Sequence, residues 1–126
     1  MDILLTAILG ALAKLSDTAV RDAYQALKGL IRKKFGTDSG LSEAVDAVEK
    51  KPDSRARQDM LKEELTEGQA GADDELLTAA RAVIDTVRNL PDGQGVIQKI
   101  QVTQNIRGDR NIVTGTGDIQ IGPTSN

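Results

Sequence analysis

The chain has 126 residues, of which 39% are hydrophobic and 2% aromatic, and its formal net charge is −3. It contains neither cysteine nor histidine, which excludes thiol chemistry, the usual zinc sites and any nucleophile activated by histidine. The negative charge and the scarcity of aromatic rings argue against nucleic-acid binding. We therefore expect one modest domain with an appendage, no cofactor and no enzymatic activity.

The amino-terminal segment, residues 2–15, is predicted to be a helix that is apolar on nearly all sides. Such a helix is normally buried or in contact with lipid. The segment lacks the basic start of a secretory signal, and its apolar run of about 12 residues is shorter than the roughly 20 that a bilayer requires. We predict a core helix in the resting protein, and a membrane-active helix as its functional state. The side chains that would enter lipid are Ile3, Leu4, Leu5, Ile8, Leu9 and Leu12.

Four more helices are predicted by the spacing of apolar residues, over residues 17–35, 41–51, 54–67 and 73–90. Suitable capping residues stand at the start of three of them: Ser16 or Asp17, Asp53 or Ser54, and Asp73 or Asp74. The fourth helix has a thin apolar face of Ala56, Met60, Leu61 and Leu65.

Short connections between these helices predict a bundle of four to five helices over residues 1–90. Its core must consist of Leu, Ile, Val and Ala, with Tyr24 and Phe35 as the sole aromatic residues. Pro91-Asp-Gly-Gln-Gly95 breaks the last helix, so residues 91–95 are predicted to be a linker.

Basic residues gather at the end of the second predicted helix, at Lys28, Arg32, Lys33 and Lys34. A solvated helix end that complements the helix dipole explains them. The functional alternative is contact with the headgroups of anionic lipids.

Residues 96–126 contain neither leucine nor alanine and are rich in β-branched residues, amides and glycines. β-branched residues favour strands, and the apolar period changes to two at Ile100 and Val102. Gly108, Gly115 and Gly122 recur at intervals of seven residues, each after a short β-branched unit. We predict a β-rich tail of the β-arch or cross-β type, in which copies of the chain stack. A β-hairpin that caps the bundle of a monomer is the alternative.

The tetrad Ile119-Gln-Ile-Gly122 resembles the core of the RIP homotypic interaction motif (RHIM), through which animal necroptosis kinases co-assemble into amyloid. Fungal and bacterial immune systems have similar motifs. In a stack of identical strands, the two isoleucines would enter a dry interface and Gln120 would form an amide ladder. The predicted amyloid motif comprises Asn105, Ile106, Gly108, Asn111, Ile112, Val113, Gly115, Ile119, Gln120, Ile121 and Gly122.

The helical part resembles the bacterial Bell domain, an analogue of the fungal HeLo-type death-inducing domains, over roughly residues 1–90. The resemblance lies in the apolar start MDILLTAILGALAKL and in residues 26–36 and 41–65. It implies a protein that is cytoplasmic at rest and disrupts the inner membrane once its tail has been templated into a homo-oligomeric fibril. The implied partner is an NLR-type receptor that carries a similar motif.

Two other functions remain open on the sequence. In the first, the protein is a non-lytic adaptor whose helical bundle docks another protein while the tail polymerises. In the second, it is a plain soluble regulatory domain, which requires the tail to be a folded hairpin.

Overall fold

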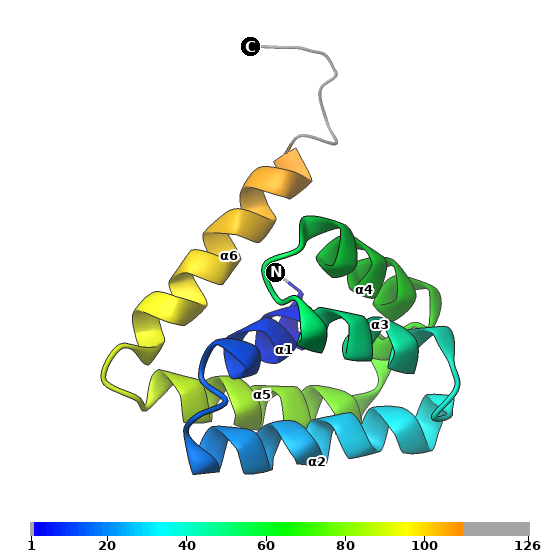
Figure 1. Ribbon diagram of the computed structural model, residues 1–126, viewed down its shortest axis with the longest axis horizontal. Helices are drawn as coiled ribbons and strands as arrows, with labels where there is room; N and C mark the ends of the chain where they lie inside the picture. Colours follow the sequence, from blue (N-terminus) through cyan, green and yellow to red (C-terminus); the bar gives the residue numbers. More distant parts are fainter. Residues whose placement is uncertain (1, 110–126) are drawn as a thin grey trace.

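The computed structural model describes residues 2–109 as a bundle of α-helices (Figure 1). In chain order the elements are α1 (Ile3–Ala13), α2 (Thr18–Phe35), α3 (Gly40–Lys50), α4 (Arg55–Glu67), the 3₁₀ turn η1 (Ala70–Ala72), α5 (Asp74–Arg88) and α6 (Gly93–Asp109). Residues 2–109 include no strand. The five helices predicted before residue 91 are confirmed, with differences of a few residues at their ends.

Side-chain N-caps begin every helix from α1 to α5. Each capping oxygen accepts a hydrogen bond from the backbone N–H three residues later, at 3.0–3.3 Å, and the caps are Asp2, Asp17, Ser39, Ser54 and Asp73. A cap pairs one of the N–H groups that a helix start leaves unsatisfied, and each contributes about 1 kcal/mol. Of the residues predicted to cap these helices, the structure uses Asp17, Ser54 and Asp73. The three predicted helix starts are therefore accurate.

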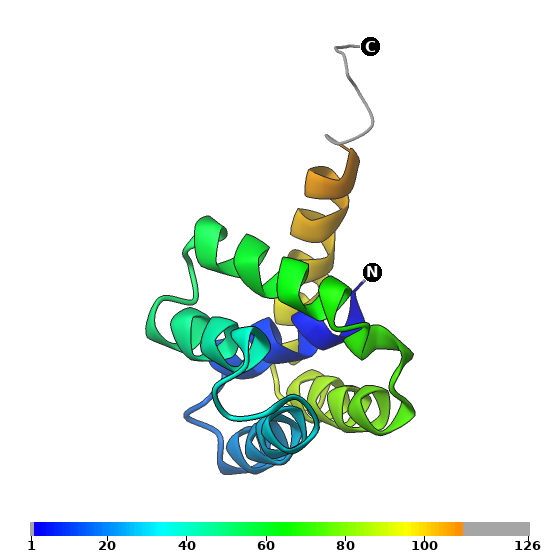
Figure 2. The same cartoon turned by 90° about the vertical axis from the view of Figure 1, so that its right-hand side faces the viewer.

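Helix α1 occupies the centre of the bundle and packs against α5, α6, α2 and α4 (Figures 1 and 2). Helices α2 and α5 lie side by side on one side of α1, and α3 and α4 form a helical hairpin. The core consists of Leu, Ile, Val and Ala side chains around a single buried ring, Tyr24, whereas Phe35 is only partly buried against it.

The apolar face of α4 is narrower than predicted. Leu61 and Leu65 are buried, but Met60 is 42% exposed and Ala56 is also exposed. Leu61 and Leu65, one turn apart, attach α4 to the core. Helix α4 also packs against α3, its partner in the hairpin.

The prediction of strands from residue 96 onward is wrong for residues 96–109, which belong to α6. Val96, Ile97 and Ile100 follow a helical spacing, and Ile97 is buried in the core with 1% of its surface exposed. Burial against α1 and α5 outweighs the strand preference of β-branched residues, which depends strongly on context. The asparagine, isoleucine and glycine of the predicted motif at positions 105, 106 and 108 therefore lie on a helix.

The predicted linker is also corrected. Residues 89–92 separate α5 from α6, and α6 already begins at Gly93, so residues 93–95 of the predicted linker are helical. The rest of the predicted amyloid motif lies outside the described residues, namely Asn111, Ile112, Val113, Gly115, Ile119, Gln120, Ile121 and Gly122.

Candidate functional site

The candidate site is α1 together with the helix that covers it. Leu4, Leu5 and Ile8 are at most 2% exposed. Ile3, Leu9 and Leu12 are partly buried and pack against the same core. The six side chains proposed to enter lipid thus all contact the bundle interior, and the prediction of a central core helix is confirmed.

The geometry of α1 limits what it can do in a bilayer. It has 11 residues, and at 1.5 Å per residue it is roughly half as long as the 30 Å hydrocarbon core of a bilayer. Within residues 2–109 no helix combines the length and the apolar character needed to cross a membrane. A single α1 therefore cannot act as an ordinary transmembrane span.

Helix α6 is fitted closely onto α1. A Cβ atom added at Gly10 of α1 would lie 2.9 Å from Cδ1 of Ile97 on α6, closer than real Cβ contacts. Gly10 therefore allows α6 to approach the α1 backbone and to bury Ile97. Gly10 thus serves a close helix–helix contact within the protein.

Two further contacts fix the start of α6. The Lys14 ammonium at the end of α1 donates a hydrogen bond to the Asp92 carboxylate, and this bond lowers the pKa of Asp92 below its ordinary value. A Cβ atom at Gly93 would lie 1.6 Å from the carbonyl oxygen of Val87 on α5. Only glycine fits at position 93, so the turn from α5 into α6 is tightly constrained.

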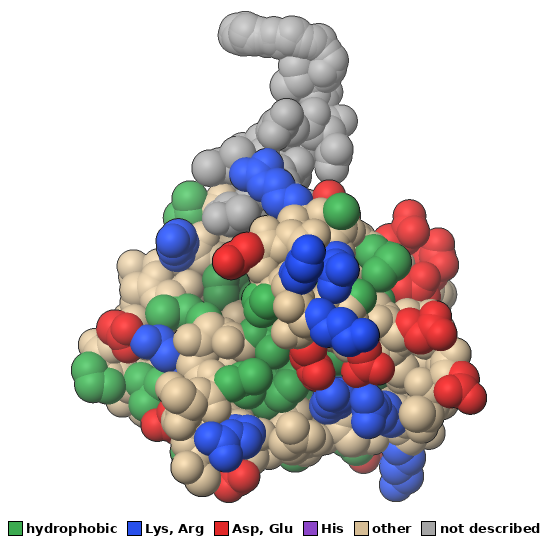
Figure 3. Space-filling model, in the orientation of Figure 1, with side chains coloured by type: hydrophobic (Ala, Val, Ile, Leu, Met, Phe, Trp, Pro, Cys, Tyr) green, Lys and Arg blue, Asp and Glu red, His purple; other side chains and the backbone are tan. Residues whose placement is uncertain are grey.

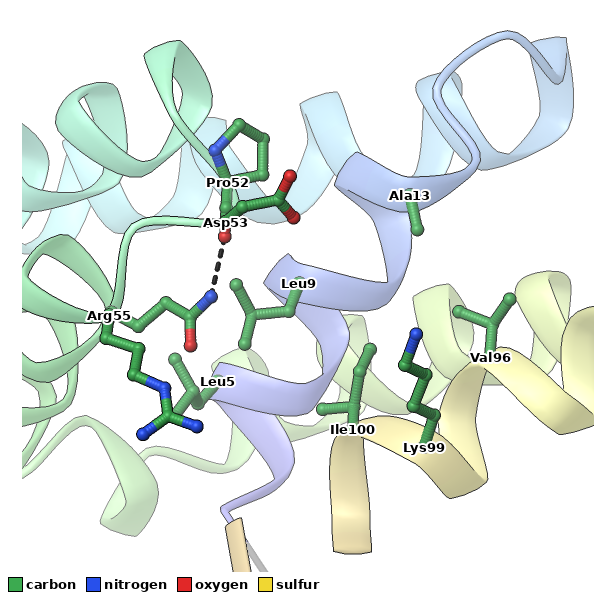
Figure 4. A pocket seen from close by; sticks show the side chains of 10 residues that line it. Leu5, Leu9, Ala13, Pro52, Asp53, Arg55, Val96, Lys99 and Ile100 are labelled. Carbon is green, nitrogen blue, oxygen red and sulfur yellow. Dashed lines mark hydrogen bonds between the residues drawn. The ribbon is translucent and has the colours of Figure 1, made fainter. Parts of the chain in front are cut away.

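A groove lies beside this contact, between α1, α6 and the connection from α3 to α4. Its volume is about 420 Å³ and its lining is mostly apolar: Leu5, Leu9, Ala13, Pro52, Val96 and Ile100, with Asp53, Arg55, Gln58 and Lys99 at the polar positions (Figure 4). Figure 3 shows apolar side chains (green) exposed in the middle of the face seen in Figure 1, with both basic (blue) and acidic (red) side chains around them.

The basic residues of α2 are engaged in ion pairs with neighbouring helices. Lys28 Nζ lies 2.7 Å from Glu49 Oε2, and Arg32 Nη2 lies 3.0 Å from Asp46 Oδ1. Tyr24 donates its hydroxyl hydrogen to the same Glu49 carboxylate at 2.5 Å, and burial together with this bond raises the pKa of Tyr24 above its ordinary value. These pairs join α2 to α3.

Lys34 makes a second set of pairs, to the start of α5. Its ammonium lies 2.9 Å from Glu75 Oε1 and 3.1 Å from Asp73 Oδ2, and these two bonds raise the pKa of Lys34. Asp73 also accepts a hydrogen bond from the N–H of Leu76, and this bond together with the one from Lys34 lowers the pKa of Asp73. Of the four basic residues proposed to contact lipid, Lys33 is exposed and makes no ion pair with the described residues.

Sequence reasoning missed α6 as part of the site. The available signal was the i, i+1, i+4 spacing of Val96, Ile97 and Ile100, with no proline between Pro91 and Pro123 to interrupt a helix. Strand propensity and the amide-rich composition outweighed this spacing in the prediction.

The family model of the Het-E N-terminal domain matches residues 1–124. No curated protein and no solved structure matches the chain. The family is related to the HeLo- and Bell-type cell-death domains, and the match is consistent with a domain of the cell-death or incompatibility type. Because the match spans nearly the whole sequence, the chain belongs to the Het-E N-terminal domain family.

Proposed function

We propose that this protein is a cell-death effector of a bacterial immune system, of the anti-phage type, that acts by perturbing a membrane. An NLR-type receptor with a similar motif templates residues 110–126 into an amyloid fibril, and the protein then moves from the cytoplasm to the inner membrane. No catalysis and no cofactor take part. The membership of a family related to HeLo- and Bell-type cell-death domains supports this proposal.

One observation carries the mechanism: α6 both leads into the proposed amyloid segment and covers α1, with Ile97 packed against Gly10. A fibril built from residues 110–126 would hold many bundles at a high local concentration. Among the described elements α6 packs on α1 and α5, so a pull on its far end acts directly on the α1 contact. Separation of α6 would expose α1, which could then insert into a nearby membrane.

The energetics explain why release needs a membrane. Exposing the buried side chains of Leu4, Leu5 and Ile8 to water costs about 5–9 kcal/mol in total, comparable to the whole stability of a small domain. Lipid tails would offset that cost, because they are as apolar as the core. Since α1 is short, several copies or a locally thinned bilayer would be needed.

A reversible cross-link tests the mechanism. Ala13 of α1 and Lys99 of α6 are both exposed and line the same groove, and the chain has no cysteine of its own. The double variant Ala13→Cys/Lys99→Cys, joined by a cleavable bismaleimide, should form fibres when seeded but should not make anionic vesicles leak. Leakage should return when the linker is cleaved. Each single-cysteine variant, labelled with the same reagent, is the control. Leakage that is unaffected by the cross-link would show that membrane damage does not require separation of α6 from α1.

The amyloid part of the proposal has its own test. Ile121→Asp places a charge where the stack would form a dry interface, so seeded fibre growth should stop. The far-ultraviolet circular dichroism of the bundle should not change. Unchanged growth kinetics, followed by thioflavin fluorescence, would argue against stacking through the tetrad.

A non-lytic adaptor is the second candidate function. It is favoured by the ion pairs that engage Lys28, Arg32 and Lys34 and by the absence, within residues 2–109, of a helix suited to span a bilayer. Seeded protein that leaves vesicles intact and captures a partner through the helical bundle would favour the adaptor.

A further inference from the structure

The groove between α1 and α6 has the size and lining of a small-molecule site. Its volume of about 420 Å³ lies within the range of about 300–1,000 Å³ that is common for ligand pockets. Leu5 and Leu9 from α1 face Val96 and Ile100 from α6, and the result is an apolar trough (Figure 4). At roughly 30 Å³ per methylene, close to the volume of a water molecule, this space holds a chain of about a dozen carbons.

The wall opposite α6 is held in place by the protein itself. Gln58 Nε2 of α4 donates a hydrogen bond of 2.6 Å to the carbonyl oxygen of Pro52, drawn as the dashed line in Figure 4. Ser54 caps α4 in the same connection. The trough is therefore formed before any ligand binds, which lowers the entropic cost of binding.

The charged groups around the trough favour an anion. Arg55 lies on the α4 side and Lys99 on the α6 side, and Asp53 is the one carboxylate that lines the groove (Figure 4). The charged lining therefore has one more positive than negative group. A linear apolar chain with one negative end matches both the trough and its charged rim.

We propose that this groove binds a single-chain anionic amphiphile of the fatty-acid type, taken up as a monomer from water. Its hydrocarbon chain lies along Leu5, Leu9 and Ile100, and its carboxylate lies at the rim beside Lys99. Because α1 and α6 both line the groove, the ligand binds only while α6 is docked, and it stabilises the docked state by mass action. This inference rests on the docked geometry and does not depend on the proposed cell-death function.

The test uses the full chain with octanoate, decanoate and dodecanoate, each kept below the concentration at which it forms micelles. Calorimetry should give one site per chain, and affinity should rise about fourfold per added methylene until the trough is full, since each buried methylene contributes about 0.8 kcal/mol. Bound dodecanoate should also slow hydrogen exchange of the α6 amides. Dodecyltrimethylammonium, with a chain of equal length and the opposite charge, should bind more weakly.

Matched variants distinguish binding in this groove from nonspecific binding elsewhere on the protein. Lys99→Glu should weaken dodecanoate binding about fivefold, whereas Lys33→Glu, the same change of charge at an exposed position on α2, should leave it within twofold. Ala13→Phe adds a ring at an exposed groove position and should abolish binding while the helicity stays normal.

The proposal would be overturned by affinity independent of chain length, by equal binding of the cationic amphiphile, or by equal effects of Lys99→Glu and Lys33→Glu. Binding to phosphatidylglycerol vesicles without any binding of monomeric dodecanoate would also overturn it, because the ligand would then be the bilayer surface. If the protein binds dodecanoate but never damages vesicles, this inference holds and the proposed function fails.

Discussion

Ile97 of α6 fills the space that Gly10 of α1 leaves open, with Cδ1 of Ile97 only 2.9 Å from where a Cβ atom at Gly10 would lie. Both residues are buried, Ile97 with 1% of its surface exposed. The contact joins α1, the most apolar of the described helices, to α6, the helix that precedes residues 110–126 in the sequence. Its strength therefore determines how readily α1 can be uncovered.

Gly10→Leu should weaken the docking of α6. Overpacking a buried contact costs about 1–3 kcal/mol, and Ile97 cannot move far because the core surrounds it. Hydrogen exchange should accelerate at the α6 amides and remain slow in α2. Gly29→Leu is the control, because nothing lies within 4 Å of a Cβ atom at this exposed glycine of α2. Equal exchange in the two variants would mean that the Gly10–Ile97 contact does not hold α6.

Gly93 and Gly95, two residues apart in α6, should respond oppositely to alanine. At Gly95 a Cβ atom meets nothing within 4 Å, so Gly95→Ala should stabilise the helix by about 0.5–1 kcal/mol. At Gly93 the Cβ atom would lie 1.6 Å from the Val87 carbonyl oxygen, so Gly93→Ala must displace the start of α6. Urea denaturation measures both changes, and stabilisation by Gly93→Ala would contradict the turn described here.

Much of the helical part of the fold could be predicted from local signals. Asp17, Ser54 and Asp73 cap helices at the predicted places, and Pro52 lies just after the end of α3. These signals act within one turn of the chain, so they are visible in the sequence alone. The apolar residues of 2–15 likewise indicate burial, because a helix without a polar face has no side to turn to water.

The α1–α6 contact could not be predicted in the same way. It depends on Gly10 and Ile97, which lie far apart in the sequence, and on tertiary packing that outweighs the strand propensity of residues 96–102. The ion pairs of Lys28, Arg32 and Lys34 also join separate helices. A charge pattern along α2 alone does not show whether such residues face solvent, lipid or a neighbouring carboxylate.

The ion pair between Lys14 and Asp92 should make the docking of α6 depend on pH. The hydrogen bond from Lys14 lowers the pKa of Asp92 below its ordinary value of 3.8, so the folded state binds this proton more weakly than the unfolded state. The stabilisation is therefore present above the ordinary pKa and is lost as the pH falls through the folded pKa. The protection factors of the α6 amides, which compare their exchange rates with the intrinsic rates at the same pH, should fall between about pH 5 and pH 2 in the natural protein.

Asp92→Asn is the control for this pH effect. The variant should exchange faster than the natural protein near neutral pH, and the difference between the two should vanish in acid. Asp73 also has a lowered pKa and caps α5, but it is present in both proteins and cancels in the comparison. If the difference in exchange persists unchanged at acid pH, the charge on Asp92 is not its cause.

Tyr24 should resist ionisation until the bundle unfolds. Burial and the hydrogen bond to Glu49 raise its pKa, so the folded state holds the phenolic proton above pH values at which the unfolded chain has lost it. Stability therefore falls as the pH rises past the ordinary value of 10.0. Tyr24 is the only tyrosine, so absorbance at alkaline pH reports this group alone, and it should change together with the loss of helicity. Tyr24→Phe should lower the free energy of unfolding by about 1.5–3 kcal/mol, the range for a lost hydrogen bond to a charged acceptor. A phenol that titrates near its ordinary pKa while the helices remain intact would show that Tyr24 is open to solvent and that the α2–α3 contact does not protect it.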